Sequence, residues 1–580
     1  MRRFTYALLA LFLCAGVARA QNVPVQEVLL DNGLRVLMVP RKGDPNIAAG
    51  WVTRTGSVNE RPGITGLSHL FEHMMFKGTR TIGTKNIEEN LKVLKEMDDV
   101  RAQIRAEEKE LIRRQRLGEV ADAKDPKARS ARHQQLIAKF DELTKREKEL
   151  MVKDEFDRIY TTAGGSGMNA GTSNDFTVYF LNVPANKLEL WFWMESDRLL
   201  NPVFREFYSE RDVVHEERRL RTDSTPTGKF DEQFEAMFWM SSPYGWPVVG
   251  WPSDLEGITR EEALEYFAVN YAPNNLTAAL VGDFEPARAT ELARKYFGRL
   301  PRGPREPEPV RTREMQQLAE QRMVAYADTT PQARVRYHTV ADGHPDDVAL
   351  SVLGSLLSGR TGRLYKTLVL QQEVANSASA GQNGSKYEGY FQLSGVAKPG
   401  KSPEDVEQAL YKEIERIQKE PVPTDELQKI KNQSAANQFR GLQSNFGLMV
   451  QLLLRDANRG WATINTDPAR VQAITPADIQ RVANKYFTPE NRTVAIYRTK
   501  QAAAGGAAED PALAGLSDQE KAQVRQLRAA LPQMNAQQVR GILQQVEQMG
   551  ASAPADKQKG IQVVKKMLED RLKQLEGGVK

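Results

Sequence analysis

The sequence contains one element twice, at a spacing the size of a whole domain. ITREEALEYFAVNYAPNNLTAAL begins at Ile258 and ITPADIQRVANKYFTPENRTVAI begins at Ile474, so the offset is 474 − 258 = 216 residues. Both stretches read Ile-Thr, a helical segment, an aromatic residue, Pro-x-Asn and a strand-like run, and they align without a gap. Solenoid repeats recur about every 20 to 50 residues. The longer period therefore predicts a duplicated domain.

The two copies divide a chain of 580 residues, which is too long for one hydrophobic core. We expect one domain at residues 21–300 and a homologous one at 315–500. The proline-rich stretch 301–314 has no apolar periodicity and is typical of a linker. Strand-like runs such as LRVLMVP and TVYFLNVP mix with helical stretches. The predicted fold class is α+β, with two homologous α/β-layer domains in tandem, each a sheet with helices packed on it.

Two segments lie outside the repeat. Residues 87–160 are dense in Lys, Arg and Glu, with apolar residues at intervals of three and four and a helix-breaking stretch, LGEVADAKDP, in the middle. This pattern predicts an inserted, charged helical hairpin with coiled-coil-like seams, which is either a solvated arm or a docking arm for a partner. Residues 501–580 predict a linker and an accessory helical tail, with one helix starting at the capping box 517–520.

The N-terminus has the pattern of a signal peptide. Arg2 and Arg3 precede an apolar run that is too short to span a bilayer, and an A-x-A cleavage site ends at Ala20. We expect residues 1–20 to be removed and the mature chain to be exported, either periplasmic or secreted. The one cysteine, Cys14, lies in this segment, so neither disulfides nor thiol chemistry are expected in the mature chain.

Charge and hydropathy exclude two classes of partner. Lys and Arg total 80 and Asp and Glu total 75, which gives a net charge of +5, and no basic stripe indicates nucleic-acid binding. No segment after the signal peptide is long and apolar enough for a transmembrane helix. We therefore expect neither a nucleic-acid partner nor a stable membrane anchor.

The stretch GLSHLFEHMMFKGT, residues 66–79, places two histidines and a glutamate in an apolar helical run. His69 and His73 are four residues apart, so they lie about 40° apart on one helix face. Two imidazoles one turn apart can bind one zinc ion, and Glu72 between them can reach a zinc-bound water. The alternative is a pair of core histidines that make ordinary hydrogen bonds.

A catalytic zinc ion needs a third protein ligand, and the stretch YSERDVVHEERRLRTD contains candidates. Glu210 and Glu217 are two helical turns apart and share a face. Glu216 points elsewhere, with Arg219 as its expected surface partner, and His215 lies about 200° around the helix from Glu217. His215 is therefore a weak ligand candidate, and Glu210 is placed to support a site built on this face.

With NAGTSNDFTVYF and SERDVVHEE, the H-x-x-E-H order resembles the inverzincin family of pitrilysin, insulin-degrading enzyme and mitochondrial processing peptidase, over about residues 25–500. The resemblance implies one Zn2+ per chain, held by His69, His73 and Glu217. It makes Glu72 the general base and Glu210 the supporting glutamate. Between His73 and Glu217 there are 217 − 73 − 1 = 143 residues, more than is usual in the family, and the inserted hairpin accounts for the excess.

A glycine-rich turn and an alternating strand follow in GGSGMNAGTSNDFTVYF. In the family, the Asn-Ala pair that matches Asn169 and Ala170 lies on an edge strand that pairs with the peptide substrate. Such pairing holds an extended chain by its backbone, with little demand on its sequence. Asn169, Ala170 and Thr172 are therefore candidate substrate-binding residues, and the alternative is an ordinary edge strand.

The second unit lacks the H-x-x-E-H residues. Aligning Ser351 with Ser68 puts Val352, Ser355 and Leu356 at the positions of the two histidines and the glutamate. As the resemblance implies, one unit is expected to be catalytic and the other structural.

A further departure from the family concerns a substrate clamp. Active members carry an Arg and a Tyr in their catalytically silent unit, and these two side chains, the clamp, reach the substrate at the zinc site. In this chain the matching stretch is LVLQQEVAN, where Val369 and Asn376 stand at the two positions. The resemblance implies that a homologous zinc-free partner subunit supplies the missing pair. The alternatives are a homodimer with weakened activity, or compensation by Arg360, Arg363 or Tyr365.

The expected function is that of an exported zinc-dependent endopeptidase that cleaves short or unfolded peptides, with the zinc-bound water activated by Glu72. The rival hypothesis is a non-catalytic assembly or peptide-binding subunit of the same fold. The intact ligand set argues against the rival, because the second unit illustrates a copy in which the ligands have decayed.

Overall fold

The computed structural model describes residues 22–500, 536–552 and 558–577, with single positions between 516 and 534. The expected signal peptide at 1–20 and the capping box at 517–520, apart from Glu520, lie outside the described residues. The chain forms two compact units, which meet in sequence between Thr499 and Lys500. No helix among the described residues is long and apolar enough to cross a membrane.

The first half of the chain builds a six-stranded sheet in the order β1-β2-β6-β3-β5-β4. Its strands are β1 (Gln26–Leu29), β2 (Arg35–Pro40), β3 (Asn46–Thr53), β4 (Ser166–Thr172), β5 (Thr177–Pro184) and β6 (Leu276–Gly282). β2 and β6 are parallel, and all other neighbours are antiparallel. β6 is buried along its whole length, which explains its almost unbroken apolar sequence. β4 lies at an edge of the sheet.

The second half builds a five-stranded sheet in the order β7-β11-β8-β10-β9. Its strands are β7 (Gln321–Ala327), β8 (Gln332–Thr339), β9 (Ala375–Gly384), β10 (Gly389–Ala397) and β11 (Arg492–Thr499). β7 and β11 are parallel, and the other neighbours are antiparallel. Apart from β1, this arrangement copies the first sheet strand for strand. The predicted fold class, two homologous sheets with helices packed on them, is confirmed.

The repeated element has the same local structure in both copies. The helices α10 (Arg260–Asn270) and α17 (Pro476–Tyr486) each begin with a capping box. Asn275 donates a hydrogen bond to the carbonyl of the last residue of α10 at 2.9 Å, and Asn491 does the same for α17 at 2.8 Å. Each asparagine thus satisfies a free carbonyl at a helix end and starts the turn into β6 or β11. This role explains why Pro-x-Asn recurs at a fixed spacing.

One face of the first sheet packs against helices of its own half. These helices include α2 (Leu67–Met74), α6 (Leu188–Leu200), α9 (Pro252–Gly257), α10 and α11 (Pro286–Tyr296). The helices of the second half are α12 (Pro345–Leu357), α13 (Pro403–Lys419), α14 (Thr424–Gln443), α15 (Asn445–Asn458), α16 (Thr463–Ala473) and α17.

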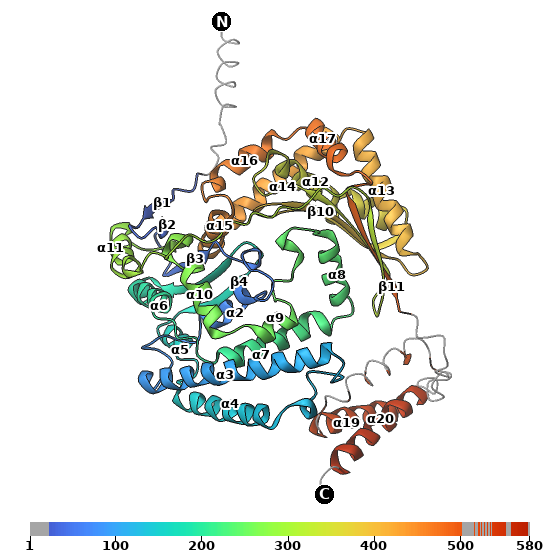
Figure 1. Cartoon of the computed structure of the whole chain (residues 1–580). Helices are drawn as coiled ribbons and strands as arrows, with labels where there is room; N and C mark the ends of the chain where they lie inside the picture. Colours follow the sequence, from blue (N-terminus) through green and yellow to red (C-terminus); the bar gives the residue numbers. More distant parts are fainter. Residues whose placement is uncertain are drawn as a thin grey trace. The chain divides into compact units, whose positions relative to one another are not determined.

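The two halves exchange one helix each. The other face of the first sheet, with Leu37 and Ala48, is covered by α15 from the second half through side chains such as Leu452. In return, α8 (Gly228–Phe238) of the first half packs Phe234 against β7 and β11 of the second sheet (Figure 1). Each half therefore completes the hydrophobic core of the other.

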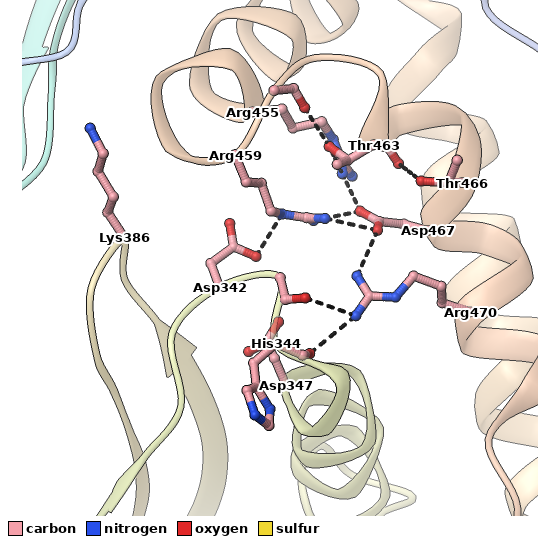
Figure 2. A network of polar contacts seen from close by, with 12 residues as sticks. Asp342, His344, Asp347, Lys386, Arg455, Arg459, Thr463, Thr466, Asp467 and Arg470 are labelled. Carbon is pink, nitrogen blue, oxygen red and sulfur yellow. Dashed lines mark hydrogen bonds and ion pairs between the residues drawn. The ribbon is translucent and has the colours of Figure 1, made fainter.

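A network of ion pairs holds α15 to its own half (Figure 2). Arg455 of α15 and Arg459, the residue after this helix, both bind Asp467 of α16, and Arg459 also binds Asp342 at 2.8 Å. Arg470 adds hydrogen bonds of 3.1 Å to two backbone carbonyls just before α12. The network ties α15 and α16 to the start of α12, while Leu448, Met449 and Leu452 of α15 lie on the first sheet.

The inserted segment is a hairpin of α3 (Ile87–Arg116) and α4 (Ala131–Leu150), which lie side by side (Figure 1). A hydrogen bond of 2.8 Å from the Lys85 amide to the Leu150 carbonyl closes its base. The next helix, α5 (Glu155–Thr162), is separate, and its residue Phe156 is buried in the main core. The predicted range 87–160 is therefore too long, because its last ten residues belong to the body.

The hairpin lies against the body along α3. Asp98 binds Arg260 at 2.6 Å and accepts a hydrogen bond from Tyr208 at 3.2 Å, and Val93, Met97, Val100 and Ile104 join the main core. The hairpin is therefore not a free-standing arm, and a role in docking a partner stays a prediction.

Two further predicted segments are the linker at 301–314 and the C-terminal tail. Residues 301–314, the predicted linker, contain neither helix nor strand. In the C-terminal unit, α19 (Ala536–Ser552) and α20 (Gln558–Gly577) pack against each other, with Val539 and Leu568 buried.

Candidate active site

The helix α2 carries the H-x-x-E-H residues and is fixed at its first turn. It begins after Gly66, whose φ of 89° is left-handed and whose added Cβ would lie 2.6 Å from a backbone oxygen, so only glycine fits there. The carboxylate of Glu60 accepts hydrogen bonds from the amides of Gly66 at 2.8 Å and Ser68 at 2.6 Å. Burial raises the pKa of Glu60 to about 8, although these hydrogen bonds oppose it.

The structure brings together the three predicted zinc ligands. Nε2 of His69 lies 3.7 Å from Oε1 of Glu217, and Nε2 of His73 lies 3.3 Å from Oε2 of the same carboxylate. One ligand atom from each residue lies within 4.8 Å of the others. Tetrahedral ligands about 2.0–2.1 Å from a zinc ion stand about 3.4 Å apart. Two imidazoles and a carboxylate at this spacing therefore fit one zinc ion.

Both histidines are shielded from water, with side chains 7% exposed for His69 and 22% for His73. Burial holds the pKa of His69 below its ordinary value, against the opposing charges of Glu72 and Glu217. This shift favours the neutral imidazole that a metal ion requires. Nδ1 of His69 is buried and has no hydrogen-bond partner in the described part of the chain.

Glu210 supports the second histidine, as the sequence predicts for this position. Its Oε2 lies 3.3 Å from Nδ1 of His73, so Nε2 is left for Glu217 and a metal ion. Burial lowers the pKa of His73, but the hydrogen bond to Glu210 and the carboxylates around it outweigh burial and raise it. The other oxygen of Glu210 binds Lys77, which also binds Glu206 at 3.1 Å.

The catalytic base candidate, Glu72, faces the edge strand β4. Thr172 donates a hydrogen bond from Oγ1 to Oε2 of Glu72 at 2.7 Å. Asn169 and Ala170 lie on the same strand, which pairs with β5 on one side only. The edge-strand position predicted for these residues is therefore what the structure has.

The residues that flank Glu217 in the sequence have different partners, and only one of them, Arg221, contacts Glu217. Glu216 binds Arg219 at 2.7 Å on the helix surface, as the spacing predicts, and His215 lies 3.7 Å from Glu256, not in the zinc cluster. The sequence reasoning missed Arg221, whose Nη1 lies 2.6 Å from Oε1 of Glu217. Its spacing of four residues from Glu217 was the signal that could have found it.

The second half contains no such cluster among its described residues. Val352 and Leu356 are buried core residues of α12, and Val369 packs against the same core. Arg363 forms a largely buried ion pair with Glu426 at 2.7 Å. Arg363 is therefore not free to replace the missing arginine of the clamp.

Comparisons with known proteins match both halves of the chain. Residues 35–107 match the model of "Insulinase (Peptidase family M16)", and residues 257–434 match that of "Peptidase M16 inactive domain". The protein named "Zinc protease PqqE" from Helicobacter pylori is 26% identical over 504 residues, which are 85% of this chain and 97% of that protein. The chain belongs to the M16 peptidase family. The resemblance drawn from the H-x-x-E-H motif is confirmed.

Other M16 relatives are more distant. The Arabidopsis thaliana protein named "Probable mitochondrial-processing peptidase subunit beta, mitochondrial" is 23% identical over 341 residues, 56% of this chain and 63% of that protein. The crystal structure of a protease from Helicobacter pylori matches with a TM-score of 0.66 and 24% identity, over 82% of this chain and all of that one. That likeness supports the two-sheet M16 fold.

Proposed function

We propose that this M16 protein is a zinc-dependent endopeptidase that is exported, to the periplasm or outside the cell, and cleaves short or unfolded peptides. The observation that carries the proposal is the convergence of His69, His73 and Glu217 from two helices, with ligand atoms within 4.8 Å of one another. The pattern of residues 1–20 supports export.

A zinc ion held by these three side chains would supply the Lewis acidity that lets water attack a peptide carbonyl near neutral pH. The chain itself supplies the proton transfers. Glu72 takes a proton from the attacking water and passes it to the leaving amine. Glu210 holds the ring of His73 in the orientation that presents Nε2 to Glu217.

The open edge of β4 supports an extended peptide as the substrate. A peptide that adds to this edge would be held by backbone hydrogen bonds near Asn169 and Ala170, beside the carboxylate of Glu72. Only an extended segment can pair in this way. Short or unfolded peptides therefore fit the site better than folded proteins do.

We further propose that a homologous, zinc-free partner subunit completes the site. Val369 and Asn376 cannot supply the guanidinium and hydroxyl of the family clamp, and Arg363 is held by Glu426. A homodimer, or compensation by Arg360 or Tyr365 within one chain, would be the other outcomes of a co-purification experiment.

The test is the Glu72→Gln variant, purified with any partner that accompanies it. We expect one zinc ion per chain, as in the wild-type protein, and loss of peptide hydrolysis, because glutamine cannot accept the proton. Glu216→Gln, on the exposed side of α7 (Phe207–Arg218), is the control that retains activity. Full hydrolysis by Glu72→Gln would refute the proposed mechanism.

The missing clamp also favours a second candidate, a non-catalytic assembly or peptide-binding subunit. Metal analysis separates the two functions. A wild-type protein that binds peptides at β4 but holds no zinc at neutral pH would favour the second.

A further inference from the structure

The face of β4 that meets α2 is fixed by its pairing with β5. Ala170 lies opposite Tyr179, and Thr172 lies opposite Thr177, and residues directly opposite each other in a sheet share a face. Tyr179 donates a hydrogen bond to the carbonyl of Phe71 in α2 at 3.1 Å. Thr172 therefore projects toward α2, and its hydroxyl meets Glu72.

A β-bulge precedes this part of the strand. The register of β4 against β5 shifts between Ser166 and Asn169, around Gly167, whose φ of 64° is left-handed. Bulges next to active sites re-aim the side chains that follow them, and a slip of one residue would turn Thr172 to the opposite face. The contact with Glu72 depends on the register between the bulge and the hairpin turn at 173–176, where Thr172 pairs with Thr177.

The carboxylate of Glu72 has little else to hold it. Within residues 22–500, the hydroxyl of Thr172 is its single hydrogen-bond donor, at Oε2, and Oε1 has no protein partner. A carboxylate with one fixed oxygen presents the other in a defined direction. A free carboxylate rotates and spends less time in the orientation that accepts a proton.

We propose that Thr172 is a positioning residue for Glu72, and not the substrate-binding residue that its strand suggests. This inference rests on the proposed function. Its hydroxyl binds Oε2, so that Oε1 faces the attacking water. The strand that docks the peptide at Asn169 and Ala170 then also orients the base, which couples substrate binding to proton transfer.

The test compares Thr172→Val, which keeps the shape and removes the hydroxyl, with Thr172→Ser, which keeps the hydroxyl. With the zinc-loaded protein, its native partner if one co-purifies, and an internally quenched peptide, we expect Thr172→Val to lower kcat about 10- to 100-fold. KM and zinc content should stay within about twofold, and Thr172→Ser should retain most of kcat. Thr161→Val is the control, because that hydroxyl only bonds its own helix.

A second measurement does not depend on activity. In crystal structures of the metal-free variants, the Glu72 carboxylate should keep its position in Thr172→Ser and leave it in Thr172→Val. An unmoved Glu72 in Thr172→Val would overturn the inference even if the wild-type protein is inactive. An unchanged kcat in Thr172→Val, or a raised KM alone, would also overturn it, the latter in favour of substrate binding. A wild-type protein without zinc or hydrolysis would instead count against the proposed function.

Discussion

Oε2 of Glu210 lies 3.3 Å from Nδ1 of His73, on the side of the ring away from Glu217. The other oxygen of Glu210 binds Lys77, so the carboxylate is held on both sides. Burial favours the neutral form of Glu210, but the hydrogen bonds from His73 and Lys77 outweigh it and lower its pKa. An ionised, fixed carboxylate makes His73 a better metal ligand.

Replacing Glu210 should therefore weaken zinc binding without abolishing it. We expect Glu210→Ala to bind zinc about 10- to 100-fold less tightly, as measured by competition with a chelator of known affinity. Glu216→Ala, six residues further along the same helix on its exposed side, is the matched control. Equal zinc affinity in the two variants would contradict the role of Glu210.

The assignment of the third ligand gives a sharper contrast. Glu217→Ala should lose zinc at micromolar concentrations, because two imidazoles alone do not complete the site. His215→Ala should retain one zinc ion per chain, because His215 lies beside Glu256 and outside the zinc cluster. Loss of zinc from His215→Ala would show that the ligand set is different.

Helical periodicity predicted part of the zinc cluster. Spacing puts His69 and His73 on one helix face and Glu210 and Glu217 on a face of another helix, and the resemblance to the family then selected Glu217 as the third ligand. The contact of Arg221 with Glu217 could have been predicted from their spacing of four residues, but the contact of Thr172 with Glu72 could not. Thr172 reaches Glu72 only because of the register of β4 against β5, and no pattern in the sequence specifies that register uniquely.

The fold was predictable within each half but not between halves. The likeness of the two sheets follows from the repeat, whereas an amphipathic helix such as α15 does not specify which sheet its apolar face covers. The end of the hairpin was misplaced for a related reason. α5 is also charged and amphipathic, and only four residues separate it from α4, so composition does not mark the boundary.

Asp456 of α15 joins the halves at the first sheet, and its removal should destabilise the protein. Its buried carboxylate binds Arg35 at 2.7 Å, Arg54 at 2.6 Å and the hydroxyl of Thr277 at 2.6 Å. Asp456→Asn leaves Arg54 without its counter-charge and leaves Arg35 with Glu27 alone, at 2.9 Å. Removing one partner of a buried ion pair costs about 3–5 kcal/mol. Because both arginines are partly exposed, we expect the free energy of unfolding to fall by about 3 kcal/mol, the low end of this range. Urea denaturation of the metal-free protein at pH 7 measures it.

The stability difference between the wild-type protein and Asp456→Asn should depend on pH. Burial raises the pKa of Asp456, but the hydroxyl of Thr277 and the two arginines outweigh burial and hold the pKa below its usual value. The stabilisation is therefore complete above the pKa of the unfolded chain, about 4, and is lost as the pH falls through the folded-state pKa. The difference between wild type and Asp456→Asn should shrink below about pH 4. A constant difference down to pH 3 would contradict this account.

The exchange of α8 and α15 predicts that neither half folds alone. Residues 22–303 expressed without the rest would expose the sheet face that α15 covers, including Leu37 and Ala48, and we expect this fragment to aggregate or to bind a hydrophobic dye. Co-expression with residues 304–500 should restore a soluble complex of the two pieces, visible by size-exclusion chromatography, because each piece supplies the helix that the other lacks. A monodisperse, cooperatively unfolding fragment 22–303 would mean that the interlocked core is dispensable for folding.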